Sequence, residues 1–229
     1  MTLTGETLLP GASLESSSLQ EPVVGACALT ARAEPGERPY VAVKCVVDAV
    51  AAAAAIALLS PLFFLIAIAI KIDSSGPILF HQRRVGRHGR VFTIHKFRTM
   101  YTSAPPNSYK VRNESAAITK LGRYLRVTGL DELPQLWNVL CGEMSLIGPR
   151  PELESIAIEL GITGHMRHSV RPGITGWWQI HHRDGQPLHH NLGYDVEYIN
   201  RMSAALDGWI AIRTFAYVVW SLITALIRR

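Results

Sequence analysis

The feature that most constrains this chain of 229 residues is a run of 22 residues without any charge, from Ala49 to Ile70. As an α-helix rising about 1.5 Å per residue, the run would reach roughly 33 Å, enough to cross a hydrocarbon core of about 30 Å. A helix buried in the core of a soluble protein is the alternative, but so long and uniformly apolar a run favours membrane insertion. Residues 49–70 therefore predict a membrane anchor.

Ser60 and Pro61 interrupt this run. A proline inside a helix removes a backbone donor and clashes with the preceding turn, so the helix bends or breaks there. Two topologies follow: a kinked span with residues 1–40 on the opposite side, or a re-entrant hairpin with both ends in the cytosol. The basic residues that follow, from Lys71 to Arg90, favour a cytosolic C-terminal part in either case. Composition alone favours the kinked span, because simple spans are far commoner.

The net charge of +5 is unevenly distributed along the chain. Residues 71–126 contain twelve Lys and Arg against two acids, which suits anionic partners such as phosphates or a membrane surface. A solvated basic face is the alternative reading. The stretch borders the anchor and contains no recognised nucleic-acid motif, so no nucleic-acid partner is expected. Three scattered cysteines without a CxxC pair exclude a disulfide scaffold and a cysteine-type zinc site.

Three regions are expected: a disordered polar tail over residues 1–39, the membrane segment over 40–72 and a folded domain over 73–229. Within that domain, two runs flanking a Gly-containing loop predict a β-hairpin of Ile78–Arg84 and Arg90–Phe97. Helices are expected at Ile118–Val127, Leu130–Leu140, Glu152–Leu160, 191–202 and Trp209–Ile227. The last is expected to be an interfacial amphipathic helix, because Arg213 near the middle of a membrane would be costly.

Two cations, Lys96 and Arg98, stand at alternate positions at the end of the second hairpin strand. On a strand both would point to the same face, which could clamp a pyrophosphate. An ordinary basic strand edge explains the pair equally well.

Two adjacent carboxylates, Asp131 and Glu132, stand at the start of a predicted helix. Such residues usually cap the helix and complement its dipole. In the functional reading, an Asp kept ionised by the helix start and nearby cations is a nucleophile toward phosphorus. The neighbouring Glu could hold Mg²⁺ on a substrate pyrophosphate. Both could reach one site only if the helix begins here, and Pro134 in the first turn is consistent with that start.

Two further segments are rigid or aromatic. Arg150 is the only charge in the loop Gly148–Pro151, where a fixed guanidinium would suit a phosphate, although a structural turn is an equal explanation. The segment 171–180 contains Trp177 and Trp178, which suit a core or a membrane interface, followed by Gln179, counted as a substrate contact. The chain contains no P-loop, GxGxxG, GxSxG or HExxH motif.

Together and in this order, KFRTM, LDELPQLWNVLCGEMSLIGPRPE and RPGITGWWQ behind a Ser-Pro-broken membrane segment resemble one family closely. It is the bacterial sugar transferases, also called monotopic polyprenol-phosphate phosphoglycosyl transferases. The resemblance runs from about Arg38 to the C-terminus. Gly129 departs from it, because family members commonly have Ser just before the Leu-Asp-Glu.

The resemblance implies transfer of a sugar phosphate from a UDP-sugar to undecaprenyl phosphate with release of UMP, at the start of exopolysaccharide or glycoconjugate assembly. Asp131 matches the nucleophile that forms a covalent phosphosugar intermediate, and Glu132 matches its Mg²⁺-linked partner. The basic residues that match those near the phosphates are Lys96, Arg98, Arg126 and Arg150. The residues that fall in the family's C-terminal pattern without an assigned role are Asp195, Tyr198 and Asp207.

The resemblance also implies that the Ser60-Pro61 break makes the membrane helix re-entrant, which overturns the preference for a span. The expected fold is α+β: a mostly helical, membrane-associated catalytic domain with a re-entrant N-terminal helix, a small β-hairpin and interfacial amphipathic helices. It would lie on the lipid bilayer of the inner membrane and face the cytosol. A UDP-releasing glycosyl transferase and an inactive scaffold of a polysaccharide machine are the alternative functions, and the oligomeric state is left open, a homodimer included.

Overall fold

The computed structural model describes residues 39–104, 115–181 and 192–227. Its elements are α1 (Pro39–Asp73), β1 (Leu79–Val85), η1 (Arg87–Gly89), β2 (Val91–Phe97), α2 (Lys120–Thr128), η2 (Leu130–Glu132), α3 (Gln135–Leu140), β3 (Ser145–Ile147), β4 (Glu152–Leu153), α4 (Glu154–Glu159), η3 (Met166–Ser169), β5 (Gly173–Thr175), α5 (Trp177–His181), α6 (Leu192–Arg201) and α7 (Ala204–Ile227). Of the predicted polar tail, only Pro39 is among the described residues.

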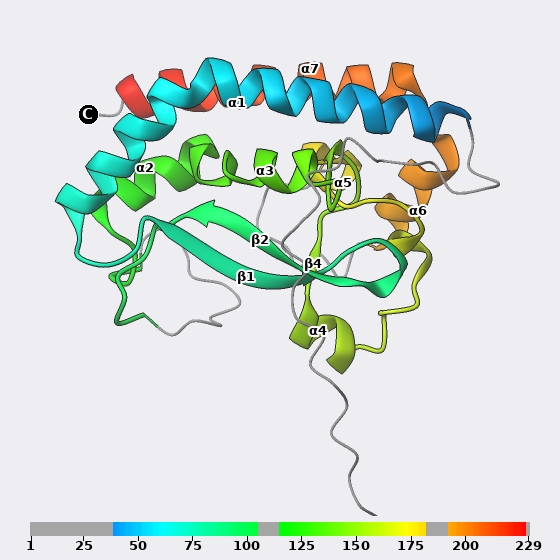
Figure 1. The fold of residues 1–229 in the computed structure, drawn as a ribbon, viewed down its shortest axis with the longest axis horizontal. Helices are drawn as coiled ribbons and strands as arrows, with labels where there is room; N and C mark the ends of the chain where they lie inside the picture. Colours follow the sequence, from blue (N-terminus) through cyan, green and yellow to red (C-terminus); the bar gives the residue numbers. More distant parts are fainter. Residues whose placement is uncertain (1–38, 105–114, 182–191, 228–229) are drawn as a thin grey trace, which may run out of the picture.

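The membrane segment forms one continuous helix of 35 residues, α1, with Pro61 inside it. The Ser60 hydroxyl donates a 2.9 Å hydrogen bond to the Ala57 carbonyl, within the turn that precedes the proline. Figure 1 shows that α1 bends along its course and that its C-terminal part descends toward the hairpin and α2. The predicted break is thus a bend in one helix, as expected where proline removes a backbone donor.

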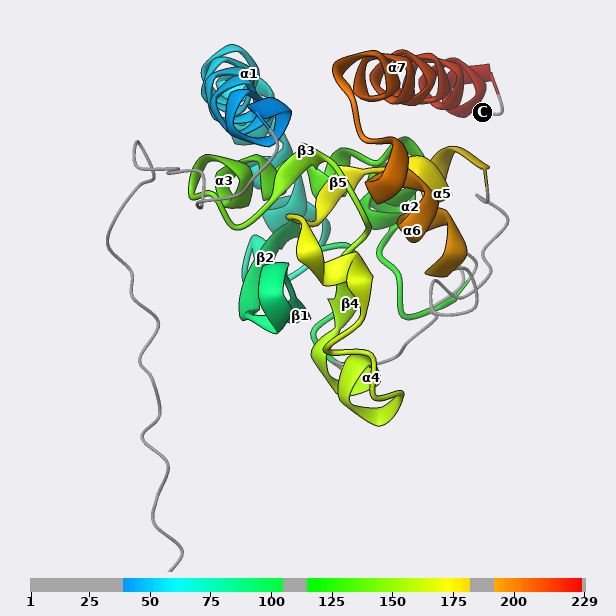
Figure 2. The same cartoon turned by 90° about the vertical axis from the view of Figure 1, so that its right-hand side faces the viewer.

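Helices α1 and α7 run side by side across one face of the molecule and form its outer layer (Figures 1 and 2). Both are long and apolar enough to cross a membrane, and little of their apolar windows, 11% and 17%, is buried within the protein. Large apolar side chains on this layer are exposed, among them Leu58, Phe64, Ile72, Ile212, Phe215 and Trp220. So large an apolar surface marks a face that meets lipid or another protein.

The β-hairpin is confirmed, with strand limits within one residue of those expected. β1 and β2 pair antiparallel from Leu79 opposite Phe97 to Val85 opposite Val91. β4 joins the other edge of β1 and gives the strand order β2-β1-β4. The expected helix over Glu152–Leu160 was therefore too long, because its first two residues are strand β4.

A second, parallel pair of strands, β3 and β5, was not predicted. Ser145 lies opposite Gly173 and Ile147 opposite Thr175. A Cβ at Gly173 would lie 2.1 Å from the Gly148 nitrogen, so glycine permits this close backbone approach. The pair fixes the loop that follows β3, which carries Arg150.

Of the three apolar clusters in the described part of the chain, two lie beneath α1 and the third packs against α7. In one cluster Ala52 of α1 packs with Phe92 and Ile94 of β2 and with the apolar face of α3. In a second cluster Ile66 and Ile70, near the other end of α1, pack with Phe97 and Leu125. Helix α1 therefore supplies part of the domain's own core along most of its length.

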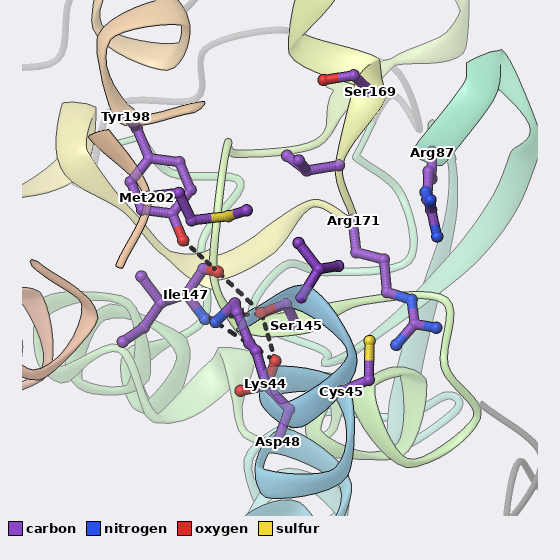
Figure 3. A pocket seen from close by; sticks show the side chains of 12 residues that line it. Lys44, Cys45, Asp48, Arg87, Ser145, Ile147, Ser169, Arg171, Tyr198 and Met202 are labelled. Atoms are coloured by element: carbon purple, nitrogen blue, oxygen red, sulfur yellow. Dashed lines mark hydrogen bonds and ion pairs between the residues drawn. The ribbon is translucent and has the colours of Figure 1, made fainter. Parts of the chain in front are cut away.

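Ion pairs and hydrogen bonds tie the N-terminal part of α1 to the start of α7. Asp207 of α7 pairs with Lys44 at 2.7 Å and accepts hydrogen bonds from the hydroxyls of Tyr40 at 2.6 Å and Tyr198 at 2.8 Å. Asp48 of α1 accepts a 2.6 Å hydrogen bond from Ser145 of β3. Figure 3 shows Lys44, Asp48, Ser145 and Tyr198 around a cavity of about 90 Å³. Asp207, left without a role by the sequence, thus joins the two long helices, and Tyr198 joins α6 to the start of α7.

Candidate active site

Asp131 and Glu132 stand on a tight turn between two helices. Helix α2 ends at Thr128 and is followed by Gly129, which has the left-handed φ of 74° that glycine adopts at helix C-termini. The 3₁₀ turn Leu130–Glu132 follows, and α3 begins only at Gln135, after Pro134. The single helix predicted over Leu130–Leu140 is therefore a turn and a shorter helix.

Glu132 is the centre of a charged cluster. Its Oε1 accepts hydrogen bonds from Lys96 Nζ at 2.7 Å and from Arg150 Nη2 at 2.9 Å. Burial alone would raise the pKa of Glu132, but Arg150 and Lys96 together hold it well below its usual range. The structure thus brings together three residues that the sequence selected, from the hairpin, the turn and the loop after β3.

Asp131 behaves differently. Its half-buried carboxylate forms no hydrogen bond within the described part of the chain. Burial raises its pKa to about 6, although Lys96 and Arg126 pull it down; the charge of Glu132 adds to the rise. With a pKa of about 6 the carboxyl is still mostly ionised at neutral pH, so the expectation of an ionised Asp131 stays a prediction. Two neighbouring carboxyls with widely separated pKa values are typical of catalytic sites.

Arg126, in the last turn of α2, belongs to this site electrostatically, because its charge lowers the pKa of Asp131. Arg98 does not reach it. Its buried guanidinium donates to the carbonyls of Ser74 and Ser75 and to the Ser74 hydroxyl, beyond the end of α1. Strand β2 ends at Phe97, so the alternation that would place Arg98 beside Lys96 no longer applies.

Gln179 lies in the short helix α5. Its amide donates a 2.8 Å hydrogen bond to the Ile174 carbonyl, and no hydrogen bond joins it to Glu132, Lys96 or Arg150. This places it beside β5. Its role as a substrate contact stays a prediction.

Sequence reasoning missed a buried ion pair behind Arg150. The Arg167 guanidinium pairs with Asp195 at 2.9 Å, with side chains only 1% and 2% exposed. It also donates a 2.5 Å hydrogen bond to the backbone carbonyl of Arg150. Arg167 therefore connects α6 to the loop that carries the cation beside Glu132. Burial raises the pKa of Asp195 to about 6, against the opposing charge of Arg167.

Asp131 and Glu132 supply oxygen donors of the type that Mg²⁺ takes. Within the described residues, no group of three or more His, Cys, Asp and Glu side chains could enclose an ion. Mg²⁺, however, commonly takes one or two carboxylates and completes its shell with substrate phosphates and water. Glu132 uses only Oε1 toward its cations, and Asp131 stands beside it, so the donor set suits Mg²⁺ bound to a phosphate.

These features define the class of protein. A half-buried carboxylate beside three cations is suited to an anionic, phosphate-containing substrate. This site belongs to a domain whose core includes a membrane-type helix and whose outer layer is exposed and apolar. The exposed apolar layer suits contact with lipid or another protein, and the cation cluster suits a phosphate.

The family model described as bacterial sugar transferase matches residues 39–221, and the chain belongs to that family. It is 38% identical over 187 residues to an Aeromonas hydrophila UDP-N-acetylgalactosamine-undecaprenyl-phosphate N-acetylgalactosaminephosphotransferase, covering 79% of this chain and 44% of that protein. It is 39% identical over 193 residues to a Caulobacter vibrioides UDP-glucose:undecaprenyl-phosphate glucose-1-phosphate transferase, covering 78% and 72%. The exopolysaccharide production protein ExoY of Rhizobium meliloti is 35% identical, covering 76% and 84%. Against several longer relatives, the match spans about a third to under half of their length.

Proposed function

We propose that this protein transfers a sugar 1-phosphate from a UDP-sugar to undecaprenyl phosphate and releases UMP, at the start of exopolysaccharide or glycoconjugate assembly. The observation that carries the proposal is that Asp131 stands next to Glu132, whose carboxylate binds both Lys96 and Arg150. Relatives of this chain are named as sugar phosphotransferases that use undecaprenyl phosphate.

In the first step, an Asp131 carboxylate oxygen attacks the phosphorus of the phosphate that carries the sugar. The bond from that phosphorus to the bridging oxygen breaks and UMP leaves. The sugar phosphate remains on Asp131 as an acyl phosphate. Lys96, Arg126 and Arg150 lower the repulsion between the carboxylate and the anionic diphosphate. Mg²⁺ held by Glu132 would neutralise further phosphate charge.

In the second step, a phosphate oxygen of undecaprenyl phosphate attacks the same phosphorus. The bond to the Asp131 oxygen breaks, the free carboxylate is regenerated and a lipid-linked diphosphosugar forms. One site can thus handle a soluble donor and a lipid acceptor in turn. The apolar outer layer of α1 and α7 supports this role, because it would hold the site at headgroup depth.

We infer further that α1 is re-entrant, so that the catalytic domain lies on the cytosolic side of the inner membrane. The supporting observation is that one folded domain contacts α1 at Lys44 and again at Ile70. These positions are 26 residues apart, about 39 Å along a straight helix. A span would carry one of them across a hydrocarbon core of about 30 Å.

The test is nucleotide release by the purified protein in nanodiscs, with Mg²⁺, undecaprenyl phosphate and a panel of UDP-sugars. We expect UMP with at least one sugar and its loss in Asp131→Asn. A stoichiometric burst of UMP before the lipid is added would report the covalent step. Glu159→Gln, an exposed carboxylate on α4, is the matched control and should retain the burst.

Two outcomes would contradict the proposal. Release of UDP would indicate a glycosyl transferase that breaks the sugar–phosphate bond. If the wild type released no nucleotide with any donor of a broad panel, an inactive scaffold would be favoured.

A further inference from the structure

Two histidines face each other across the β-hairpin. His81 of β1 and His95 of β2 stand directly opposite in the antiparallel register. The side chains of such a pair leave the same face of the sheet. Their Nδ1 atoms lie 2.8 Å apart, and the ring centroids lie 4.9 Å apart with the rings edge to face. We call these two residues the hairpin histidine pair.

The pair can be reached from outside the protein. His81 is exposed and His95 is half-buried. Both help to line a cavity of about 380 Å³ that is open to the surface between the hairpin, α1 and α3. The other residues that line this cavity, among them Ile56, Phe63 and Trp137, carry no charge. Since a water molecule occupies about 30 Å³, an ion with several bound waters has room beside the two imidazoles.

The chemistry of the pair is that of a transition-metal ligand set. Neutral imidazole is the commonest protein ligand of such ions. Burial lowers the pKa of His95, and the neighbouring His81 lowers it further, which favours the neutral form that binds metal. Within the described residues, no carboxylate lines the cavity, so a hard ion such as Mg²⁺ lacks the ligands that it prefers.

The spacing of the two nitrogens fits neighbouring positions around one ion. With metal–nitrogen bonds of about 2.0 Å, two ligands at a right angle are about 2.8 Å apart, and two at a tetrahedral angle about 3.3 Å. The distance of 2.8 Å corresponds to the right angle of a square-planar or tetragonal site, the geometry of Cu²⁺ and Ni²⁺. Both rings must turn so that their lone pairs meet at the ion instead of sharing a proton. His81 is exposed, so its ring has the space to turn.

We propose that the hairpin histidine pair binds a divalent ion of a late first-row transition metal, through both Nδ1 atoms and with water in the remaining positions. Cu²⁺ should bind more tightly than Ni²⁺ or Zn²⁺. The described part of the chain adds no third histidine, cysteine or carboxylate, so binding should be reversible by a chelator. A bound ion would join β1 to β2 through their side chains. The proposal does not rest on the proposed function.

The first experiment uses Trp137 as a reporter, because it lines the same cavity and Cu²⁺ quenches the fluorescence of nearby indoles. Titration of the purified protein in nanodiscs with Cu²⁺ should give a saturable quenching component. In His81→Asn we expect its affinity to fall by about tenfold or more. In Trp137→Phe the component should disappear. His88→Asn, an exposed histidine in the loop of the same hairpin, is the matched control and should keep the wild-type titration.

The sequence contains other histidines that bind Cu²⁺ in principle, including the adjacent pairs at 181–182 and 189–190. Quenching that is unchanged in His81→Asn, or that persists in Trp137→Phe, would therefore place the ion elsewhere and overturn the proposal. A wild type without a saturable component would overturn it as well. None of these results bears on UMP release, which tests the proposed function separately.

Thermal unfolding tests the site without fluorescence. An ion that binds the folded hairpin and not the unfolded chain raises the Tm. At about a hundred times its dissociation constant, Ni²⁺ should raise the wild-type Tm by roughly 5 °C, and EDTA should reverse the rise. The rise should be absent in His95→Asn. No rise in the wild type, or an equal rise in His95→Asn, would contradict the proposal.

Discussion

Asp131 and Glu132 are consecutive in the chain, yet their carboxyl groups titrate on opposite sides of the ordinary range. Burial raises the pKa of Asp131 to about 6, whereas Arg150 and Lys96 overcome burial and hold the pKa of Glu132 well below normal. One carboxylate is thus a permanent charge that organises cations, and the other gains or loses its proton near neutral pH.

The first prediction concerns the pH dependence of the first step. Only ionised Asp131 can attack phosphorus, and its pKa is raised to about 6, so activity is present above pH 6 and is lost as the pH falls. The UMP burst rate should be about tenfold lower at pH 5 than on its plateau, since one pH unit changes the ionised fraction about tenfold. Rapid-quench measurements with saturating donor would show this.

Asp195 is the control for that assignment, because burial raises its pKa to about 6 as well. Asp195→Asn should keep an acid limb in the pH profile. If the pH profile of this variant became flat, the acid limb would be assigned to Asp195 and not to Asp131.

The second prediction concerns stability. A carboxyl with a raised pKa favours the folded state when protonated, and that contribution is lost as pH rises from the unfolded value of 3.8 through about 6. Asp131→Asn removes the buried charge, so its Tm should exceed that of the wild type at pH 8. The difference should shrink toward pH 5, as thermal unfolding in detergent would reveal. A constant difference at both pH values would contradict the linkage.

The third prediction concerns Arg167 as a positioning residue. Its hydrogen bond to the Arg150 carbonyl fixes the loop whose guanidinium binds Glu132 and helps lower the pKa of Asp131. In Arg167→Lys we expect a 10- to 100-fold slower UMP burst, as small misplacements at a reacting centre produce. The acid limb should also move above pH 6 as Arg150 is displaced.

Arg83→Lys is the matched control for this change, because Arg83 forms an exposed pair with Glu154 on another surface. It should keep the wild-type burst and pH profile. A lower Tm in Arg167→Lys without a shift of the acid limb would reduce Arg167 to a purely structural role.

The fourth prediction concerns Gly129. Its φ of 74° is strained for any other residue, although a Cβ there would meet nothing within 4 Å. Gly129→Ala should therefore lower stability by about 1–2 kcal/mol through backbone strain alone. It should also slow the burst, because the turn it begins carries Asp131. Gly161, with φ of 65° and equal space, is the control: Gly161→Ala should lose similar stability and keep its burst.

The fifth prediction concerns topology. Because one domain contacts both ends of α1, tags at the N- and C-termini should both resist protease added outside spheroplasts. Both should be cleaved once the inner membrane is permeabilised. Cleavage of the N-terminal tag alone in intact spheroplasts would restore the kinked span.

Local sequence signals predicted much of the fold and part of the site. Two runs flanking a Gly-containing loop were sufficient to predict the β1–β2 hairpin. Charge type selected Lys96, Glu132 and Arg150, which the structure joins. The parallel pair β3–β5 was missed because each strand has three residues, too few for periodicity, and their pairing joins distant segments.

The remaining errors arise from burial, which sequence does not display. Arg98 resembled Lys96 in spacing, yet its guanidinium is buried against Ser74 and Ser75. Arg167, which no sequence pattern selected, is almost fully buried with Asp195. Burial also raises the pKa of Asp131, an effect that the sequence alone does not display.

The packing beneath α1 has a practical consequence. Phe92 and Ile94 rest on Ala52, and Phe97 and Leu125 rest on Ile66 and Ile70. Cutting the chain after Asp73 to obtain a soluble enzyme would therefore strip one side from two apolar clusters. Expression trials that start at the hairpin should yield aggregates, because here the anchor is also a wall of the enzyme's interior.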